Sequence, residues 1–158
     1  MRRWAYFIYG VVSHALFFGV FAYLAGFVGN FAVPKSIDSA AGGPISIAIA
    51  IDILLMGLFA AQHSIMARPE FKRIWTRIVP EPIERSTYVL AACMVTVLLM
   101  WQWRGIDLVV WDVRQPFFRR SLWGLFAIGW LWVPLTSVLI NHFDLFGTRQ
   151  VWLHLQGR

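Results

Sequence analysis

The sequence predicts an all-α, polytopic membrane protein with four transmembrane helices and a short interfacial helix. Its residues are 59% hydrophobic and 16% aromatic, and only 14% are charged, whereas a soluble domain has about 25% charged residues. Four apolar segments approach or exceed the length of about 20 residues that a helix needs to span a bilayer. Most Lys and Arg residues lie between these segments, where lipid phosphates lie. We therefore expect a single transmembrane domain over residues 1–158.

The first two predicted transmembrane helices cover residues 4–28 and 45–66. The basic start Met1-Arg2-Arg3 also occurs in signal peptides, but the following apolar run exceeds the usual core of about 7–15 residues. Asp52 lies inside the second apolar segment. Since a charged side chain is costly in lipid, we expect Asp52 to face the bundle interior. There it is interpreted as a partner in helix packing, in preference to a catalytic acid.

The second half of the chain predicts three further helices. Apolar side chains at three- and four-residue intervals, followed by two prolines, favour a short interfacial helix with its basic residues toward the headgroups. Pro80 and Pro82 are expected to prevent a continuous helix before Glu84. The predicted ranges are about 69–79 for the interfacial helix and 84–103 and 119–143 for the transmembrane helices.

The distribution of basic residues predicts an orientation. With the N-terminus in the cytoplasm, nine Lys and Arg residues face inside and five face outside, which agrees with the positive-inside rule. Both termini and the 67–83 connection are then cytoplasmic. Because the net charge of +6 is spread over these connections, membrane lipid is the expected partner, and nucleic acid is not.

Several polar residues lie at helix ends that this topology brings to one membrane face. They are His63, Arg68, Glu84, Arg85, His142 and Arg149. His63 is interpreted as a general base, a ligand or an interhelical hydrogen-bonding residue. Arg85 is suited either to an anionic cofactor group or to Glu84 and lipid phosphate. Tyr88 fits packing better than proton donation, and the group Asn141, His142 and Asp144 is also explained by interfacial solvation.

Common soluble-enzyme motifs are absent from the sequence, including phosphate-binding Gly-rich loops, paired-Cys zinc patterns and HExxH. No metal site is predicted, and the single cysteine, Cys93, is interpreted as a small core residue. A triad of Ser64, His142 and Asp144 has no support from spacing. His14 and His63 are possible haem ligands, but their depths differ by roughly 10 Å, which disfavours haem.

Three segments resemble the bacterial methanethiol S-methyltransferases and the NnrU-like proteins, within the broader isoprenylcysteine carboxyl methyltransferase-like membrane group. They are Gln62-His63-Ser64-Ile65-Met66-Ala67-Arg68-Pro69, Glu84-Arg85-Ser86-Thr87-Tyr88 and Asp144-Leu145-Phe146-Gly147-Thr148-Arg149-Gln150. The resemblance covers nearly the whole chain and implies a bacterial inner-membrane protein. It also implies methyl transfer from S-adenosylmethionine to methanethiol, which yields dimethyl sulfide.

The resemblance suggests roles for the residues at this face. His63 or His142 would supply the base, and Arg85 or Arg149 a positive field for the thiolate. The predicted catalytic residues are His63, Arg85 and His142. The predicted cofactor-binding residues are Arg68, Glu84, Tyr88, Asn141, Asp144, Arg149 and Gln150.

The chain differs from this group at its C-terminal end. The group's later Arg-His-Pro and Tyr cofactor motif and its acidic pair do not occur before Arg158. The sequence is then either an N-terminal portion of a longer enzyme or a shortened relative without the usual cofactor site. We favour the first, in which a C-terminal part completes the cofactor site and the isolated chain is inactive without it. The alternative prediction is a non-enzymatic, NnrU-like membrane protein of nitrogen-oxide metabolism or a haem-binding helix bundle. The sequence predicts neither an oligomeric state nor the exact thiol.

Overall fold

The computed structural model of the protein describes residues 1–40, 42–106, 108–109 and 111–158. Within these residues the fold is all-helical, as predicted. Four helices are long and apolar enough to cross a membrane: α1 (Arg2–Gly29), α2 (Ile45–Met66), α4 (Glu81–Gln102) and α5 (Pro116–Ile140). Three short helices complete the fold: α3 (Pro69–Trp75), α6 (His142–Leu145) and α7 (Thr148–Leu155).

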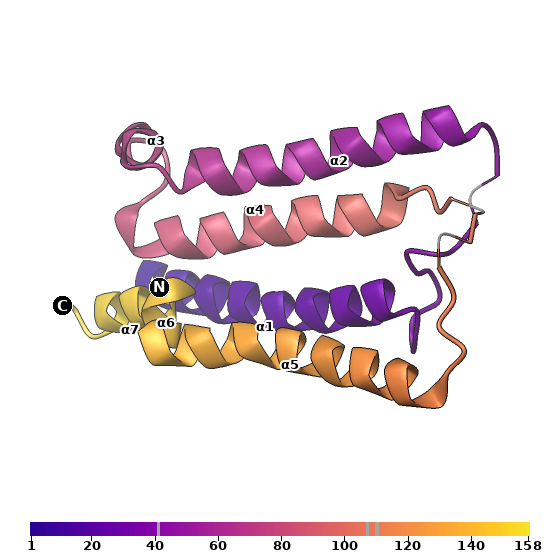
Figure 1. The fold of residues 1–158 in the computed structure, drawn as a ribbon. Coiled ribbons are helices and arrows are strands. Elements are labelled where there is room, and N and C mark those ends of the chain that lie inside the picture. Colours follow the sequence, from indigo (N-terminus) through magenta and orange to yellow (C-terminus); the bar gives the residue numbers. More distant parts are fainter. Residues whose placement is uncertain (41, 107, 110) are drawn as a thin grey trace.

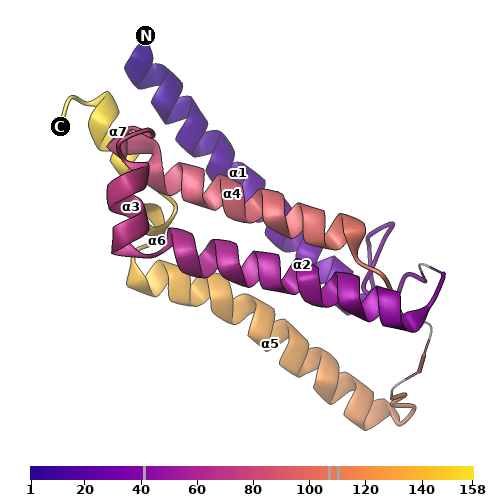
Figure 2. The same cartoon turned by 90° about the horizontal axis from the view of Figure 1, so that it is seen from above.

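The long helices lie side by side, and the short helices gather at one end of the bundle (Figure 1). Helix α4 is central, because it packs against both α1 and α2. Helix α5 has no buried residue, and it lies along one edge of the bundle in the view of Figure 2. Both chain termini lie at the end that carries α3, α6 and α7 (Figure 1). The helix ends that the sequence predicted to converge therefore lie at one end of the bundle.

Proline explains two of the differences from the predicted helix boundaries. Helix α4 begins at Glu81 and α5 at Pro116, three residues earlier than expected in both cases. Pro82 and Pro116 both occupy the first turn, where a backbone N–H has no intrahelical partner and its loss costs little. The expectation that Pro82 would delay the helix was wrong for this reason.

The last third of the chain differs more from the prediction. Helix α5 ends at Ile140, because Asn141 has a φ of 153° and separates α5 from α6. Helix α7 was not predicted, and α3 ends at Trp75, earlier than expected. The chain thus turns sharply after α5 and returns to the bundle as two short helices.

Helix α7 docks between the N-terminal halves of α1 and α4. Val151 has no exposed surface. A Cβ placed on Gly10 of α1 would lie only 2.6 Å from the Cγ2 atom of Val151. Gly147 has a φ of 81°, and a Cβ there would lie 2.8 Å from both the Arg85 Cβ and the Ser86 backbone nitrogen. These two glycines let α7 approach closely, and the contact at Gly147 holds the first turns of α4 in place.

Polar contacts also connect the opposite end of the bundle. Oδ1 of Asp52 accepts a hydrogen bond from the Arg104 backbone N–H at 2.9 Å, so Asp52 has the packing role expected of it. Lys35 Nζ contacts the Trp101 carbonyl oxygen. Burial lowers the pKa of Lys35, nearby Arg104 adds to this effect, and Asp52 opposes it. These contacts join α2 and the α1–α2 connection to the end of α4 and the residue Arg104 beyond it, far from the end of the bundle that carries the family motifs.

Candidate functional site

A cavity of about 570 Å³ lies between α1, α2 and α4 at the end of the bundle where the short helices gather. Helix α3, the α6 corner and one residue of α5 contribute to its wall. The lining residues are Phe17, Val20, Phe21, Leu24, Phe59, His63, Ala67, Lys72, Arg85, Tyr88, Val89, Ala92, Cys93, Thr96, Val133, Leu145 and Phe146. The volume falls within the range of about 300–1,000 Å³ that is typical of small-molecule sites.

One end of the cavity is polar and carries two cations. His63 lies at the end of α2, where its ring packs 4.1 Å from that of Phe59 and edge-on to Tyr88, with centroids 6.0 Å apart. Its Nδ1 atom is buried and has no hydrogen-bond partner among the described residues. A buried polar atom without a partner is costly, so the His63 ring, which also lines the cavity, carries one unsatisfied nitrogen.

The two cations of this polar end have different partners. Lys72 Nζ lies 3.9 Å from Oε1 of Glu84, so part of its charge is balanced. Arg85 forms no ion pair with any described residue, and no described lining residue is an Asp or a Glu. The polar end therefore favours an anion, and Arg85 is its least compensated charge.

The other end of the cavity is apolar and lies deeper in the bundle. It comprises Val20 and Leu24 of α1 and Val89, Ala92, Cys93 and Thr96 of α4. Cys93 is 5% exposed and Thr96 6%. The hydroxyl of Thr96 donates to the Ala92 carbonyl oxygen at 2.8 Å, so it presents no free donor to the cavity. From Arg85 to Thr96, α4 rises by about 16 Å, which gives the cavity an elongated shape.

His142 does not belong to this cavity. Its Nε2 atom lies 2.8 Å from Nε2 of His14, and its Nδ1 atom lies 2.7 Å from the Ser137 hydroxyl oxygen. The ring of Phe146 stacks on His14, with centroids 4.7 Å apart and planes 9° apart, and also lines the cavity. The histidine pair therefore lies behind the Phe146 wall. His14 is paired with His142 and not with His63, so the two predicted haem ligands are not brought together.

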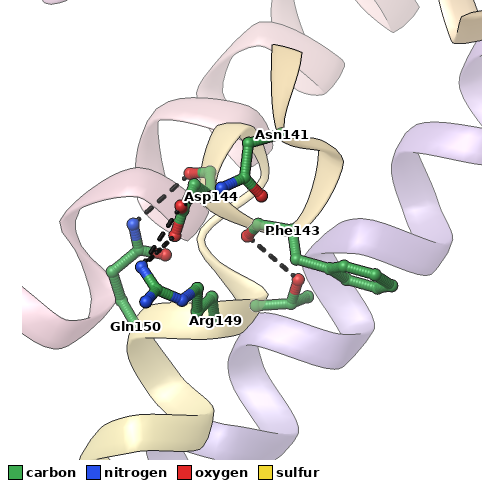
Figure 3. A network of polar contacts seen from close by, with 6 residues as sticks. Asn141, Phe143, Asp144, Arg149 and Gln150 are labelled. Carbon is green, nitrogen blue, oxygen red and sulfur yellow. Dashed lines mark hydrogen bonds and ion pairs between the residues drawn. The ribbon is translucent and has the colours of Figure 1, made fainter. Parts of the chain in front are cut away.

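Four of the predicted cofactor-binding residues, Asn141, Asp144, Arg149 and Gln150, form a separate network at α6 and α7 (Figure 3). Arg149 Nη1 lies 3.2 Å from Oδ1 of Asp144. Asn141 also donates to Asp144, and Gln150 Nε2 donates to the Asp144 backbone carbonyl oxygen at 3.4 Å. Asn141 and Arg149 line a shallower cavity of about 490 Å³ with Phe7 and Trp152. The network stabilises the α6–α7 corner and lies outside the main cavity.

The structure divides the predicted site into two groups. His63, Arg85 and Tyr88 line the main cavity, and Glu84 adjoins it through Lys72. Arg68 is exposed at the start of α3. His142, Asn141, Asp144, Arg149 and Gln150 are not among the residues that line the main cavity.

Sequence analysis missed Lys72, Cys93 and Thr96 as lining residues. Lys72 was attributed to lipid headgroups and Cys93 to the core. A usable signal was present in α4, because residues 85, 88, 89, 92, 93 and 96 recur at helical spacing and therefore share one face. The prediction stopped at Tyr88, where the polar residues end.

Sequence comparison finds related proteins along the whole chain. A methanethiol S-methyltransferase of Mycobacterium tuberculosis is 51% identical over 100% of this chain and 65% of its own length. One of Crocosphaera subtropica is 44% identical over 96% of this chain and 59% of its own length. Human Nurim is more distant, at 30% identity over 69% of this chain and 44% of its own length.

These relatives are longer than the sequence described here, which spans between about half and two thirds of the bacterial relatives it matches. No protein-family model matches the chain, and no solved structure matches it. The matches confirm the resemblance that the three sequence motifs predicted.

Proposed function

Because the chain is homologous to the methanethiol S-methyltransferases along its whole length, we propose that it forms the membrane-embedded core of a methyltransferase acting on a small thiol. The proposed reaction converts methanethiol to dimethyl sulfide with S-adenosylmethionine as methyl donor. The observation that carries the proposal is the cavity, in which His63, Arg85 and Tyr88 of two family motifs line one polar end. No comparable observation favours the NnrU-like or haem-binding alternative.

The polar end of the cavity fits the charged part of this donor. Lys72 and Arg85 are suited to a carboxylate, and the guanidinium of Arg85 can bind it in bidentate fashion. The faces of Phe59 and Tyr88 suit a positively charged sulfonium group through cation–π attraction. When bound, S-adenosylmethionine would supply an electrophilic methyl group on this sulfonium and a neutral thioether as the leaving group.

The residues of this chain would prepare the thiol for that transfer. A thiolate is a far better nucleophile than a thiol, so a base must remove the proton. His63 is the proposed base, since its imidazole lines the polar end of the cavity beside Arg85 and a histidine is the most common general base. The positive charge of Arg85 would stabilise the thiolate, and the apolar lining would exclude water.

We further propose that a C-terminal part, implied by the family resemblance, completes the cofactor site. The network of Asn141, Asp144, Arg149 and Gln150 lies outside the main cavity and is a candidate contact for that part. Membrane lipid surrounds the four long helices in this proposal. The proposed location is the bacterial inner membrane, with the cavity end and both termini facing the cytoplasm.

The test is methyl transfer from methyl-labelled S-adenosylmethionine to methanethiol by the full-length protein in membranes. Labelled dimethyl sulfide is the expected product. His63→Asn should lower the rate by about 10²–10⁴-fold at neutral pH, and the loss should shrink as rising pH deprotonates the thiol without a base. His154→Gln is the matched control, because His154 stacks on Tyr6 and lies outside the cavity. A folded protein that binds the donor and forms no labelled product would overturn the proposal.

A further inference from the structure

The proposed function places the charged part of the methyl donor at the polar end of the cavity, so the volume of about 570 Å³ is shared between the donor and the thiol. Methanethiol contains only one carbon and one sulfur atom, and the cavity extends about 16 Å along α4. The charged groups of the cavity all lie at one end, with His63, Lys72 and Arg85. The space beyond Val89 therefore lies past the position where the reacting sulfur would meet the proposed base.

The lining of this deeper space indicates what can occupy it. Val20, Leu24, Val89 and Ala92 offer only hydrocarbon, and Cys93 adds a weakly polar thiol. The Thr96 hydroxyl is already bonded to the Ala92 carbonyl oxygen. Water needs two to four polar partners to be held in a cavity, and the described lining of this end supplies too few. An apolar group is the better occupant.

We propose that this apolar end binds the hydrocarbon chain of thiols larger than methanethiol, so that the substrate class includes straight-chain alkanethiols of several carbons. The inference rests on the proposed function, because the sulfur of such a thiol would lie beside His63 and its chain would point toward Thr96. The reaction is unchanged: the thiol loses its proton to His63, a sulfur–carbon bond forms to the donor methyl group, and the donor sulfur keeps the electron pair of the broken bond.

Burial of the chain predicts a graded preference among thiols. Each buried methylene favours binding by about fourfold. The gain is made equally in the ground and transition states, so it should lower KM and leave kcat nearly unchanged. We expect KM to fall by about fourfold per methylene from methanethiol to 1-propanethiol and 1-pentanethiol, until the chain fills the apolar end.

A bulky side chain at Ala92 tests the location of the subsite. Ala92→Leu should reduce the ratio of the methanethiol KM to the 1-pentanethiol KM by at least about tenfold in the full-length protein, since it occupies the space of two or more methylenes. Ala60→Leu is the matched control, because Ala60 is exposed on α2 and lies outside the cavity. It should leave the ratio unchanged. Thr96→Leu, one turn deeper, replaces Ala92→Leu if the latter fails to fold.

A binding measurement separates this inference from the proposed function. Methyl pentyl sulfide, the thioether product of 1-pentanethiol, should raise the Tm of the full-length protein more than dimethyl sulfide does. Ala92→Leu should remove the difference, and Ala60→Leu should keep it. Equal effects of the two thioethers on the unsubstituted protein, or a difference that persists in both Ala92→Leu and Thr96→Leu, would overturn the subsite. Absence of methylation of every thiol would overturn the proposed function, while the Tm difference would still decide whether the subsite exists.

Discussion

At the scale of single residues, Arg85 is the charge that defines the polar end of the cavity. It lies in the second turn of α4, where the close approach of Gly147 holds the backbone of residues 85 and 86. Lys72 shares the same end but is partly balanced by Glu84. The unbalanced charge of Arg85 makes it the residue whose removal should affect an anionic ligand most.

We predict that Arg85→Ala lowers kcat/KM for thiol methylation by about 10- to 100-fold, because a hydrogen bond to a charged group contributes about 1.5–3 kcal/mol. Arg85→Lys should recover part of the loss, since it keeps the charge and loses the bidentate geometry. Steady-state kinetics of the full-length protein measures both effects. Arg73→Ala, an exposed change on α3, is the control, and an equal loss in that variant would contradict a specific role for Arg85.

Gly147 has a structural role that its position in a family motif does not reveal. Its φ of 81° is unfavourable for other residues, and an added Cβ would lie 2.8 Å from the Ser86 backbone nitrogen. We predict that Gly147→Ala destabilises the protein by about 1–3 kcal/mol. The Tm in detergent should fall accordingly.

Gly124→Ala is the matched control for Gly147→Ala. Gly124 lies inside α5 and has no atom within 4 Å of an added Cβ. Alanine in a helix interior is more stable than glycine by roughly 0.5–1 kcal/mol, so Tm should stay constant or rise. A fall in Tm of similar size for both variants would refute the steric role of Gly147.

At the scale of elements, α5 has the weakest attachment to the bundle. None of its residues is buried. Its Trp130 ring packs 5.0 Å from that of Phe21 of α1, and its Phe126 ring lies beside Gly29 at the end of α1. The hydrogen bond between His14 and His142 connects the α5–α6 corner to α1. This bond should therefore hold the corner, and with it the Phe146 wall of the cavity.

We predict that His14→Ala and His142→Ala are energetically coupled. Interhelical hydrogen bonds in membranes contribute about 0.6 kcal/mol on average and up to about 1.7 kcal/mol, so the double variant should be less destabilised than the sum of the single variants by about that amount. Unfolding of all three variants in detergent measures the coupling. The control cycle pairs His14→Ala with His154→Ala, which should be additive, and additivity in the His14–His142 cycle would contradict the contact.

At the scale of the whole molecule, the arrangement of the helices makes a prediction about membrane sides. Both termini and α3 lie at one end of the bundle (Figure 1), and the α1–α2 and α4–α5 connections lie at the other. The proposed function places the first end in the cytoplasm, where a soluble methyl donor is accessible. The excess of Lys and Arg at this end agrees with that orientation.

Cysteine labelling in intact cells tests the orientation. Cys93 is the only cysteine in the sequence and is 5% exposed, so it contributes little background. A membrane-impermeant maleimide should label Asp112→Cys in intact cells, and Gln156→Cys only after permeabilisation. Both positions are exposed. The reverse labelling pattern would place the cavity end outside.

Much of the fold could be predicted because its signals are local. The four long helices follow from apolar segments of bilayer length, and α2 occupies the predicted range, Ile45–Met66. The small boundary error at Pro82 came from treating proline as a helix breaker in the first turn, where it is tolerated, and Pro116 begins α5 in the same tolerated position. Helix α7 was missed because its eight residues form a single amphipathic segment, which becomes stable only when Val151 is buried against α1 and α4.

The site could be predicted only in part. His63, Arg85 and Tyr88 were identified because they are polar residues at the ends of apolar segments, and the structure brings them to one cavity. His142 was assigned to the same site by the same argument, but its rotation toward His14 removes it from the cavity. Proximity to one membrane face thus predicted which residues lie at the same depth, and it did not predict which of them point toward each other.

The sequence by itself determined the membrane class, the four long apolar helices and the end of the bundle where the polar residues gather, since hydropathy and charge act over a few residues. The tertiary structure alone decided which helix faces meet: it paired His14 with His142, 128 residues apart, and placed Cys93 and Thr96 in the cavity with Arg85. The physical reason is that a bilayer selects apolar segments by their length and composition. It does not select their rotation, which depends on close packing such as that of Gly10 and Gly147 against their neighbours.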